Sequence, residues 1–428
     1  MSERLPCQTP GCTGTILPAT ALKTGGICMP CYQQKKALEH QAYIEQNRKE
    51  VNRYAGINDP VEILKIMHSP RRHDPLIQEV PYPRTAQEIY HGLTKEERDR
   101  MESYAVDLLE EEDTDQAEMI LLSLACFTRG EIKLGLEAFM REEIYHPSIL
   151  YKDAGVEIRS QLIEKVESDP ANRNHLLLAL AWIGDEAVVR QFAVWRESPP
   201  EWASALYQPP EAYARFAGWE LDEEGGQRWL FHRECYPFKI SAEDSTEAPA
   251  TPAAVTVLQA GMQSCPWCGG GLTELFDFDL QHPQLEFMKL PGKRLRIAAC
   301  MHCNCYGTVY MKADLEGRYS WSEYNVVPEY LPEHGGGTYE ADWREMRLSE
   351  QPAGTYESAE WTLEAPASQI GGHPAWIQDA DYPACPCCAR TMTFVAQADM
   401  GQVADDEGIY YAFVCRECLI TAVNYQQT

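Results

Sequence analysis

Apolar positions are arranged differently in the two halves of this chain. From about Thr85 to Trp229, apolar stretches alternate with short polar turns, and Thr94–Glu97 has the form of a capping box, which predicts helices. Beyond about residue 255, short aromatic runs are separated by glycines, as in Leu275–Leu280 and Tyr410–Val414, which predicts strands. The pattern therefore predicts an α+β multidomain protein.

Two stretches of the helical region have the same order of apolar and polar positions. Leu122–Phe127 precedes a turn and a second apolar stretch, and Leu178–Ile183 precedes Gly184, Asp185 and another apolar stretch. Gly184 can end one helix in the left-handed conformation, and Asp185 can cap the next. Helix pairs repeated in this way predict a HEAT-like middle domain.

The segments outside the helical region are simpler in pattern. A charged, proline-free run from Tyr32 to about Tyr54 predicts a helix with a thin apolar stripe. Residues 68–84 carry four prolines and predict an extended connector. Residues 241–256 are small, polar and proline-bearing, which is typical of a linker.

Twelve of the sixteen cysteines form three sets of four, each made of two closely spaced pairs. Two such pairs, which stand about thirty residues apart in the second and third sets, supply four thiolates, the ligand set of a tetrahedral structural zinc site. Four thiolates leave no position for a catalytic water, so we predict up to three structural Zn²⁺ sites and no catalytic residue. The sets are Cys7, Cys12, Cys28 and Cys31; Cys265, Cys268, Cys300 and Cys303; and Cys385, Cys388, Cys415 and Cys418.

The spacing of the cysteines also predicts how the modules are built. The span between Cys12 and Cys28 is long enough for a β-hairpin, which predicts an N-terminal zinc ribbon. The second and third sets begin 120 positions apart, and each is arranged as hook, strand, loop, strand, hook, strand, which predicts a pseudo-duplicated β-rich domain with one zinc knuckle site per lobe. The predicted domains are 1-55, a zinc ribbon plus helix; 85-240, a helical HEAT-like domain; and 255-428, the duplicated zinc-binding domain.

Part of the β-rich region resembles a known family. Ser368–Gln378, the hook Cys385–Cys388 and the aromatic run Gly408–Cys415 resemble the YwqG-like family, a bacterial domain of unknown function. The shared features are a glycine-glycine-x-proline-x-tryptophan element before a cysteine hook and an aromatic strand near the end. The resemblance covers roughly residues 250 to 428. Members often lie near genes for contact-delivered or polymorphic toxins, so the resemblance implies an immunity role for some of them.

The charge of the chain limits its partners. A formal net charge of -28 repels phosphate, so nucleic-acid binding by the whole chain is unfavourable, whereas a cationic protein is a suitable partner. No run of eighteen apolar residues and no apolar signal segment at Met1–Cys12 are present, so no membrane partner is predicted. Paired thiols in such a chain favour a reducing, cytoplasmic location. The oligomeric state stays open.

Two motifs suggest catalysis but are incomplete. His232–Glu234 followed by Cys265–Cys268 is similar to the signature of zinc deaminases, yet Ser264 stands where that signature has proline, and the second cysteine set already has four ligands. We interpret His232 as a helix-end or surface histidine. His334–Gly337 is similar to the oxyanion loop of α/β-hydrolases, but no G-x-S-x-G is present.

These observations favour a non-enzymatic cytoplasmic binding protein, most specifically an immunity protein that neutralises a secreted bacterial toxin of the type VI or Rhs-like polymorphic kind. One alternative is an enzyme or ligand-binding protein with a site between the two C-terminal lobes. Another is a nucleic-acid-associated zinc protein, based on the ribbon and on Lys35, Lys36, Arg48, Lys49 and Arg53. The aromatic residues that could anchor a protein partner are Trp361, Trp376, Tyr339 and Tyr382.

Overall fold

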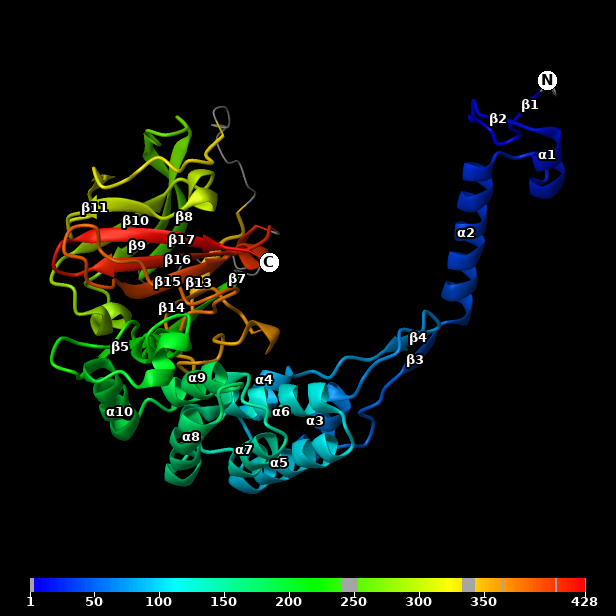
Figure 1. Ribbon diagram of the computed structural model, residues 1–428. Helices are drawn as coiled ribbons and strands as arrows, with labels where there is room; N and C mark the ends of the chain where they lie inside the picture. Colours follow the sequence, from blue (N-terminus) through cyan, green and yellow to red (C-terminus); the bar gives the residue numbers. More distant parts are fainter. Residues whose placement is uncertain (1–3, 241–252, 333–342, 364, 405, 428) are drawn as a thin grey trace. The chain divides into compact units, whose positions relative to one another are not determined.

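A computed structural model describes residues 4–240, 253–332, 343–363, 365–404 and 406–427 (Figure 1). The chain is a mixed structure, 38% helical and 22% strand, as the sequence predicts at this level. It divides into two units, Met1–Ile89 and Tyr90–Thr428, which are taken in turn below. None of the helices in the described ranges has the length and apolar content needed to cross a membrane.

The smaller unit is built from short strands and one long helix. Pro18 in the first turn and Gly25 in the left-handed conformation bound a helix between Cys12 and Cys28, so the β-hairpin predicted for this span is wrong. The helix predicted from Tyr32 to about Tyr54 is present but ends earlier, at Asn47. The elements are β1 (Leu5–Pro6), β2 (Thr15–Ile16), α1 (Pro18–Thr24), α2 (Met29–Asn47), β3 (Lys49–Val51), α3 (Pro60–His68) and β4 (Ile77–Glu79), with β1 and β2 antiparallel and β3 and β4 parallel.

The helices of the larger unit begin and end where the local sequence predicts. The Thr94 side chain accepts a hydrogen bond from the backbone N–H of Glu97, whose carboxylate in turn accepts from the backbone of Thr94. Gly184 has a φ of +51°, and Asp185 caps the helix that follows. The helices are α5 (Lys95–Glu110), α6 (Thr114–Phe127), α7 (Lys133–Arg141), α8 (Val156–Ser168), α9 (Arg173–Ile183) and α10 (Glu186–Glu197), while α4 (Ala86–Tyr90) spans the division between the units.

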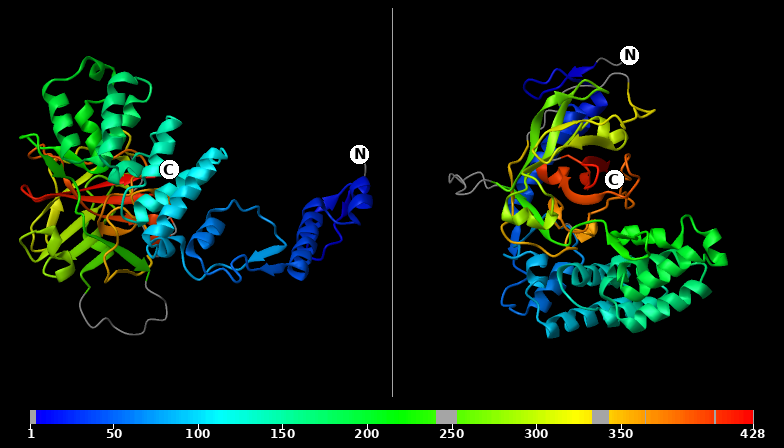
Figure 2. Two further views of the ribbon diagram at one scale, coloured as in Figure 1. Left: turned by 90° about the horizontal axis from the view of Figure 1, so that it is seen from below. Right: turned by 90° about the vertical axis from the view of Figure 1, so that its left-hand side faces the viewer.

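Two sheets form the β-rich part of the larger unit, and the helices cover one end of it (Figure 2). The first, in the order β10-β9-β8, contains β8 (Val255–Ser264), β9 (Gly271–Asp279) and β10 (Arg294–Ala299). The second, in the order β12-β11-β17-β16-β15-β14-β7-β13, contains β7 (Cys235–Ile240), β11 (Val309–Ala313), β12 (Tyr319–Trp321), β13 (Met346–Leu348), β14 (Gln369–Gly371), β15 (Thr393–Asp399), β16 (Ile409–Cys415) and β17 (Ile420–Gln426). The smaller elements are β5 (Trp219–Leu221), β6 (Gln227–Trp229), α11 (Met400–Val403) and the 3₁₀ turns η1 (Ser148–Asp153), η2 (Glu201–Ala205), η3 (Pro210–Ala217), η4 (Pro283–Met288), η5 (Cys303–Tyr306) and η6 (Trp361–Leu363).

The core lies on both faces of the eight-stranded sheet. On one face, Phe276 and Phe278 of β9 pack in a single cluster with Val414 of β16. On the other, Phe413 packs with Trp376 and its neighbours. All seven residues of β16 are consequently buried, which explains why this strand is a continuous apolar run and does not alternate.

The order of elements around the second and third cysteine sets is the same. In each, a hook precedes a strand (β9 or β15), a second strand (β10 or β16) leads to the return hook, and a third strand follows (β11 or β17). The third strands of the two sets pair with each other, with Val309 opposite Val423. The first segment therefore contributes only its third strand, β11, to the eight-stranded sheet, while β9 and β10 remain in the three-stranded sheet. β7 joins the eight-stranded sheet from inside the range predicted for the helical domain.

Candidate metal centres

All twelve predicted cysteines come together in the three predicted sets. Within each set, the four Sγ atoms lie within 4.8 Å of one another. A tetrahedral site with zinc–sulfur bonds of about 2.3 Å has sulfur–sulfur edges of about 3.8 Å, whereas a disulfide bond measures about 2.05 Å. The observed separations fit the tetrahedron: Cys12–Cys28 3.7 Å, Cys265–Cys303 3.7 Å, Cys268–Cys300 3.5 Å and Cys388–Cys415 3.7 Å. All three groups could therefore hold metal ions.

The first set joins the β1–β2 turn to the start of α2. The backbone N–H of Cys7 donates to the carbonyl of Gly14 at 2.9 Å, which closes the turn, and Cys28 is the N-cap of α2. The backbone N–H of Cys28 also donates to the Sγ atom of Cys7 at 3.2 Å. Hydrogen bonds from the Thr9 hydroxyl and from the Cys28 backbone lower the pKa of Cys7 to about 6, which favours its thiolate.

The second set is held by a tight turn before β9. The N–H of Gly269 donates to the carbonyl of Cys265 at 2.8 Å, and Gly269 has a φ of +76°. A hydrogen bond from the Cys300 thiol, together with nearby backbone N–H groups, lowers the pKa of Cys265 to about 5. The same hydrogen bond to Cys265, with burial, raises the pKa of Cys300.

The third set repeats this geometry with one difference. The N–H of Ala389 donates to the carbonyl of Cys385 at 2.8 Å, and Ala389, where the second set has glycine, has a φ of +61°. The backbone N–H of Arg390 is the main cause that lowers the pKa of Cys388 to about 7, and burial raises the pKa of Cys415 to about 11. In all three sets one thiolate forms readily, and a bound cation would favour deprotonation of the rest.

The histidine singled out in the deaminase-like motif does not belong to a metal centre. His232 is buried, so its interpretation as a helix-end or surface residue is wrong. Its Nε2 atom lies 3.2 Å from the Arg416 guanidinium, and its ring packs against Phe287 at 5.2 Å. Burial lowers the pKa of His232 to about 4. The residue packs beside the return hook of the third set and is not among the cysteine groups.

The glycine-glycine motif serves packing between helices and sheet. The His373 ring lies 4.8 Å from that of Trp182 on α9 and 5.3 Å from that of Phe231. Gly371 has a φ of +64°, and a Cβ atom there would lie 2.0 Å from the carbonyl oxygen of Glu234. Only glycine fits this close approach of two backbones. The motif therefore joins the helical and β-rich parts of the larger unit.

The aromatic anchors predicted from the sequence are mostly internal. Trp376 stacks on Tyr411 with ring centroids 4.6 Å apart, and Tyr382 packs edge-on against Trp376 at 5.2 Å. Trp361 is 56% exposed. Tyr339, the His334–Gly337 turn and most of the predicted linker at 241–256 lie outside the described residues.

A surface loop after β12 is the apolar feature that sequence reasoning missed. Val326 and Tyr330 are each 81% exposed, and Tyr324 and Val327 are exposed beside them. The loop runs between two cysteine sets, because Leu331 packs against the second set and the Tyr324 hydroxyl lies near Cys387, which stands beside Cys388 of the third set. Its signal in the sequence is a run of apolar residues with neither strand nor helix periodicity.

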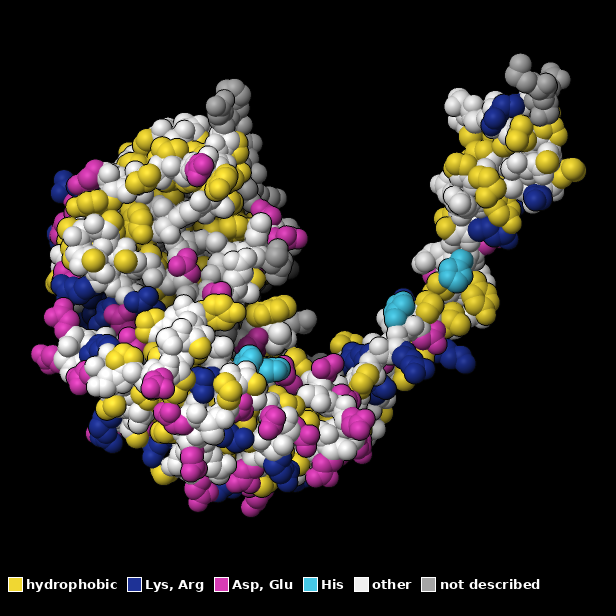
Figure 3. Space-filling model, viewed as in Figure 1, with side chains coloured by type: hydrophobic (Ala, Val, Ile, Leu, Met, Phe, Trp, Pro, Cys, Tyr) yellow, Lys and Arg dark blue, Asp and Glu magenta, His cyan; other side chains and the backbone are white. Residues whose placement is uncertain are grey.

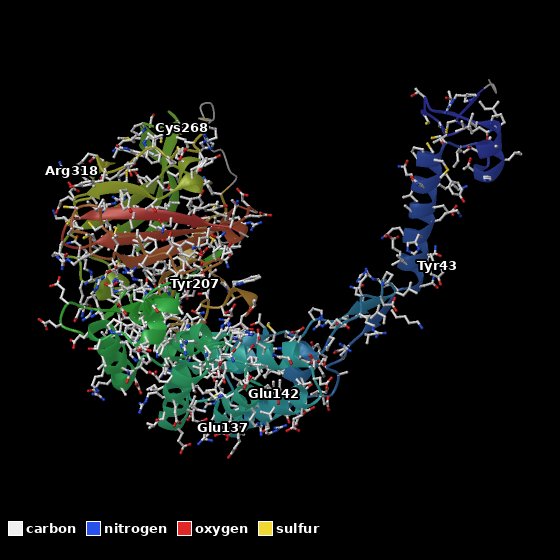
Figure 4. The ribbon with its side chains drawn as sticks, viewed as in Figure 1. Tyr43, Glu137, Glu142, Tyr207, Cys268 and Arg318 are labelled. Carbon is white, nitrogen blue, oxygen red and sulfur yellow. The ribbon has the colours of Figure 1, made fainter. Side chains whose placement is uncertain are left out.

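The second set and the helical part lie at different ends of the larger unit. In Figure 4, Cys268 lies at the end of the β-rich part away from the helices, whereas Tyr207 lies on their side. A groove of about 1080 Å³ lies between β8 and β13, with described lining residues that all fall between Ala253 and Glu350. None comes from the third cysteine set, so this groove is not a site shared by the two predicted lobes.

Comparison with known proteins identifies one full-length relative. The chain is 39% identical over 437 residues to "Uncharacterized protein YpfL" of Salmonella typhimurium (strain LT2), and the match covers 100% of both chains. No family model matches, and no solved structure matches. The resemblance to the YwqG-like family therefore stays a prediction.

Proposed function

The chain belongs to the family of the Salmonella protein YpfL, whose name states no activity. We propose its function from the chain's own surface and metal centres. We propose a non-enzymatic binding protein, stabilised by zinc, that captures a cationic protein. Its most specific form is an immunity protein that neutralises a secreted bacterial toxin.

The distribution of charge is the observation that carries this proposal. Residues 90–428 contain 26 Lys and Arg against 56 Asp and Glu, a formal charge of −30, whereas residues 1–89 contain 11 against 9, a charge of +2. Asp and Glu side chains are prominent over the helices of the larger unit (Figure 3). Such a surface accelerates encounter with a cationic partner and repels other acidic proteins.

The exposed loop Tyr324–Tyr330 supports a protein partner more specifically. An exposed Tyr side chain such as that of Tyr330 can enter a partner's pocket and supply much of the binding energy, and the neighbouring Val side chains add apolar area. Glu329 lies within the loop and would match a cationic rim on the partner, whereas Glu323, just before the loop, is paired with Lys312 at 2.6 Å. The closely placed cysteine sets would hold the loop in one conformation, which reduces the entropy lost on binding.

Zinc is the metal we propose for the three centres. Four thiolates at tetrahedral spacing suit zinc, with iron as the chemical alternative. The centres would be structural, because four protein ligands exclude a substrate. With them we propose the finer architecture: a zinc module at the N-terminus, a HEAT-like middle and a duplicated, YwqG-like β-rich domain. Elemental analysis should give three zinc ions per chain, and iron or fewer than two zinc ions would contradict this assignment.

Co-expression tests the immunity form of the proposal. Cells that produce the toxin encoded beside this gene should survive only when the chain is present, and the purified pair should bind with an affinity that falls as salt rises. The double variant V326D/Y330A should abolish rescue, whereas V156D/V194D, at exposed helix positions of the same unit, should not. An absence of both binding and rescue by the wild type rejects the proposal.

The β8–β13 groove favours a second candidate function, the binding of a small ligand. Its volume is that of a ligand site, and apolar residues of β8 line it. A ligand found by thermal shift should stabilise the wild type but not L348W, which would fill the groove. A ligand that stabilises both equally would exclude this site.

A further inference from the structure

The smaller unit carries a basic surface, although the net charge of the whole chain is −28. The β3–β4 ribbon and its flanking turns contain Arg48, Lys49, Arg53, Arg71 and Arg72, all exposed. Figure 3 shows Lys and Arg side chains gathered along these strands. We infer that this ribbon binds the phosphate backbone of single-stranded nucleic acid, an activity separate from capture of a cationic protein by the larger unit.

Three of these cations are free to meet a ligand. Arg53 and Arg71 both approach Glu79, at 3.7 and 3.4 Å. Arg48, Lys49 and Arg72 have no carboxylate partner among the described residues. Unpaired cations on an exposed ribbon release counterions when they meet phosphates, and this release is the main source of sequence-independent affinity.

The nearby acidic residues do not cancel this surface. Glu79 is occupied by two arginines. Asp74 is exposed and keeps its charge, although its carboxylate is held within its own turn by the backbone N–H of Leu76 at 2.9 Å. Glu50 is exposed on β3, between Lys49 and Arg53 in the sequence. Five Lys and Arg therefore face three acidic residues over segments 48–54 and 71–82.

Aromatic rings beside the arginines favour a single strand over a duplex. The rings of Tyr54 and Tyr82 lie 5.1 Å apart, half-buried, and an Arg71 Nη2 atom lies 3.4 Å from the Tyr54 hydroxyl. Unpaired bases stack on tyrosine and arginine planes, whereas bases inside a duplex cannot. The exposed large apolar side chains of β3 and β4 are only Val51 and Ile77 among the described residues, too few for a protein interface, so a protein ligand is disfavoured here.

Fluorescence anisotropy of the full chain with a labelled 20-nucleotide single strand tests this inference. We expect binding in the micromolar range at low salt and a log–log salt slope of about −2, since each single-strand contact contributes about 0.7. R48E/K49E/R72E should weaken binding at least tenfold and flatten the slope. The control K95E/R190E/R318E makes the same change in net charge on the larger unit and should have little effect.

The outcomes separate the possible ligands. Binding to the single strand that the ribbon variant loses and the control keeps supports the inference. No binding, equal loss in both variants, or equal binding to poly-glutamate overturns it, as does binding only to vesicles of phosphatidylglycerol and phosphatidylcholine. Stronger binding to a duplex than to the single strand overturns the role of the tyrosines. Helical circular dichroism of both variants shows that they are folded.

Discussion

The first cysteine set and the other two have the same ligands but different surroundings. Among the described residues around the first set, the buried apolar cluster is Cys7, Ile16 and Cys28, and no residue of the 19-residue helix α2 is buried. The third set instead borders β16, of which all seven residues are buried. An isolated helix of this length is marginally stable in water. A metal in the first set would therefore replace a core, whereas a metal in the others would reinforce one.

Metal removal is the strongest way to test this difference. A chelator at neutral pH should unfold residues 4–47, because without the ion too little apolar surface is buried to order them. Hydrogen exchange measured by mass spectrometry should show protection lost across α2 but retained in β16 and β17. Equal protection of α2 with and without metal would show that something other than the ion holds the helix.

Truncation of an apolar side chain should destabilise the larger unit more than the smaller one, the reverse of metal removal. F413A removes a buried ring from the larger unit and should cost about 3–5 kcal/mol in the free energy of unfolding. L22A, at a position 89% exposed in the smaller unit, should cost about 0.5 kcal/mol or less. Denaturant unfolding of holo protein measures both. A large loss from L22A would mean that the smaller unit has a covered apolar face.

A partly buried carboxyl at Glu360 should make the stability of the larger unit depend on pH. Burial raises the pKa of Glu360, and burial with the charge of Glu360 raises that of Glu118. The native state therefore binds protons more readily than the unfolded state, so stability falls as pH rises from the ordinary carboxyl range through the raised pKa. E360Q should be modestly more stable than the wild type at pH 7 and should lose this advantage in acid. Thermal melts across pH check this, and an advantage independent of pH would contradict it.

The smallest expected effect compares the second and third sets directly. Ala389 adopts the left-handed conformation that Gly269 adopts in the equivalent turn. A389G should relieve strain and stabilise the larger unit by up to about 1 kcal/mol, while G269A should destabilise it by a similar amount. Both can be measured by unfolding with metal bound. If A389G did not stabilise the protein, or G269A did not destabilise it, the two turns would not be equivalent.

Features set by neighbouring residues could be predicted from the sequence, and features set by distant ones could not. The Thr94 capping box, the Gly184–Asp185 helix boundary and the spacing within each cysteine hook each depend on a few adjacent residues. The hooks could then be paired because four thiolates complete one metal site. The burial of Trp376 depends on its contact with Tyr411, which no local pattern records. The helix α1 was missed because cysteine spacing limits the length of a loop but not its conformation.

The pairing of β11 with β17 has a consequence for the order in which the protein folds. Val309 and Val423 are opposite each other although 114 positions separate them, and β17 lies between β11 and β16 in the sheet. Closing such a long loop is slow, whereas the second and third cysteine sets each close a loop of roughly thirty residues. Metal bound early would shorten the search by fixing the two hooks that precede β11 and β17. The supply of metal while the chain folds, and not only afterwards, would then govern how much of it reaches the native sheet.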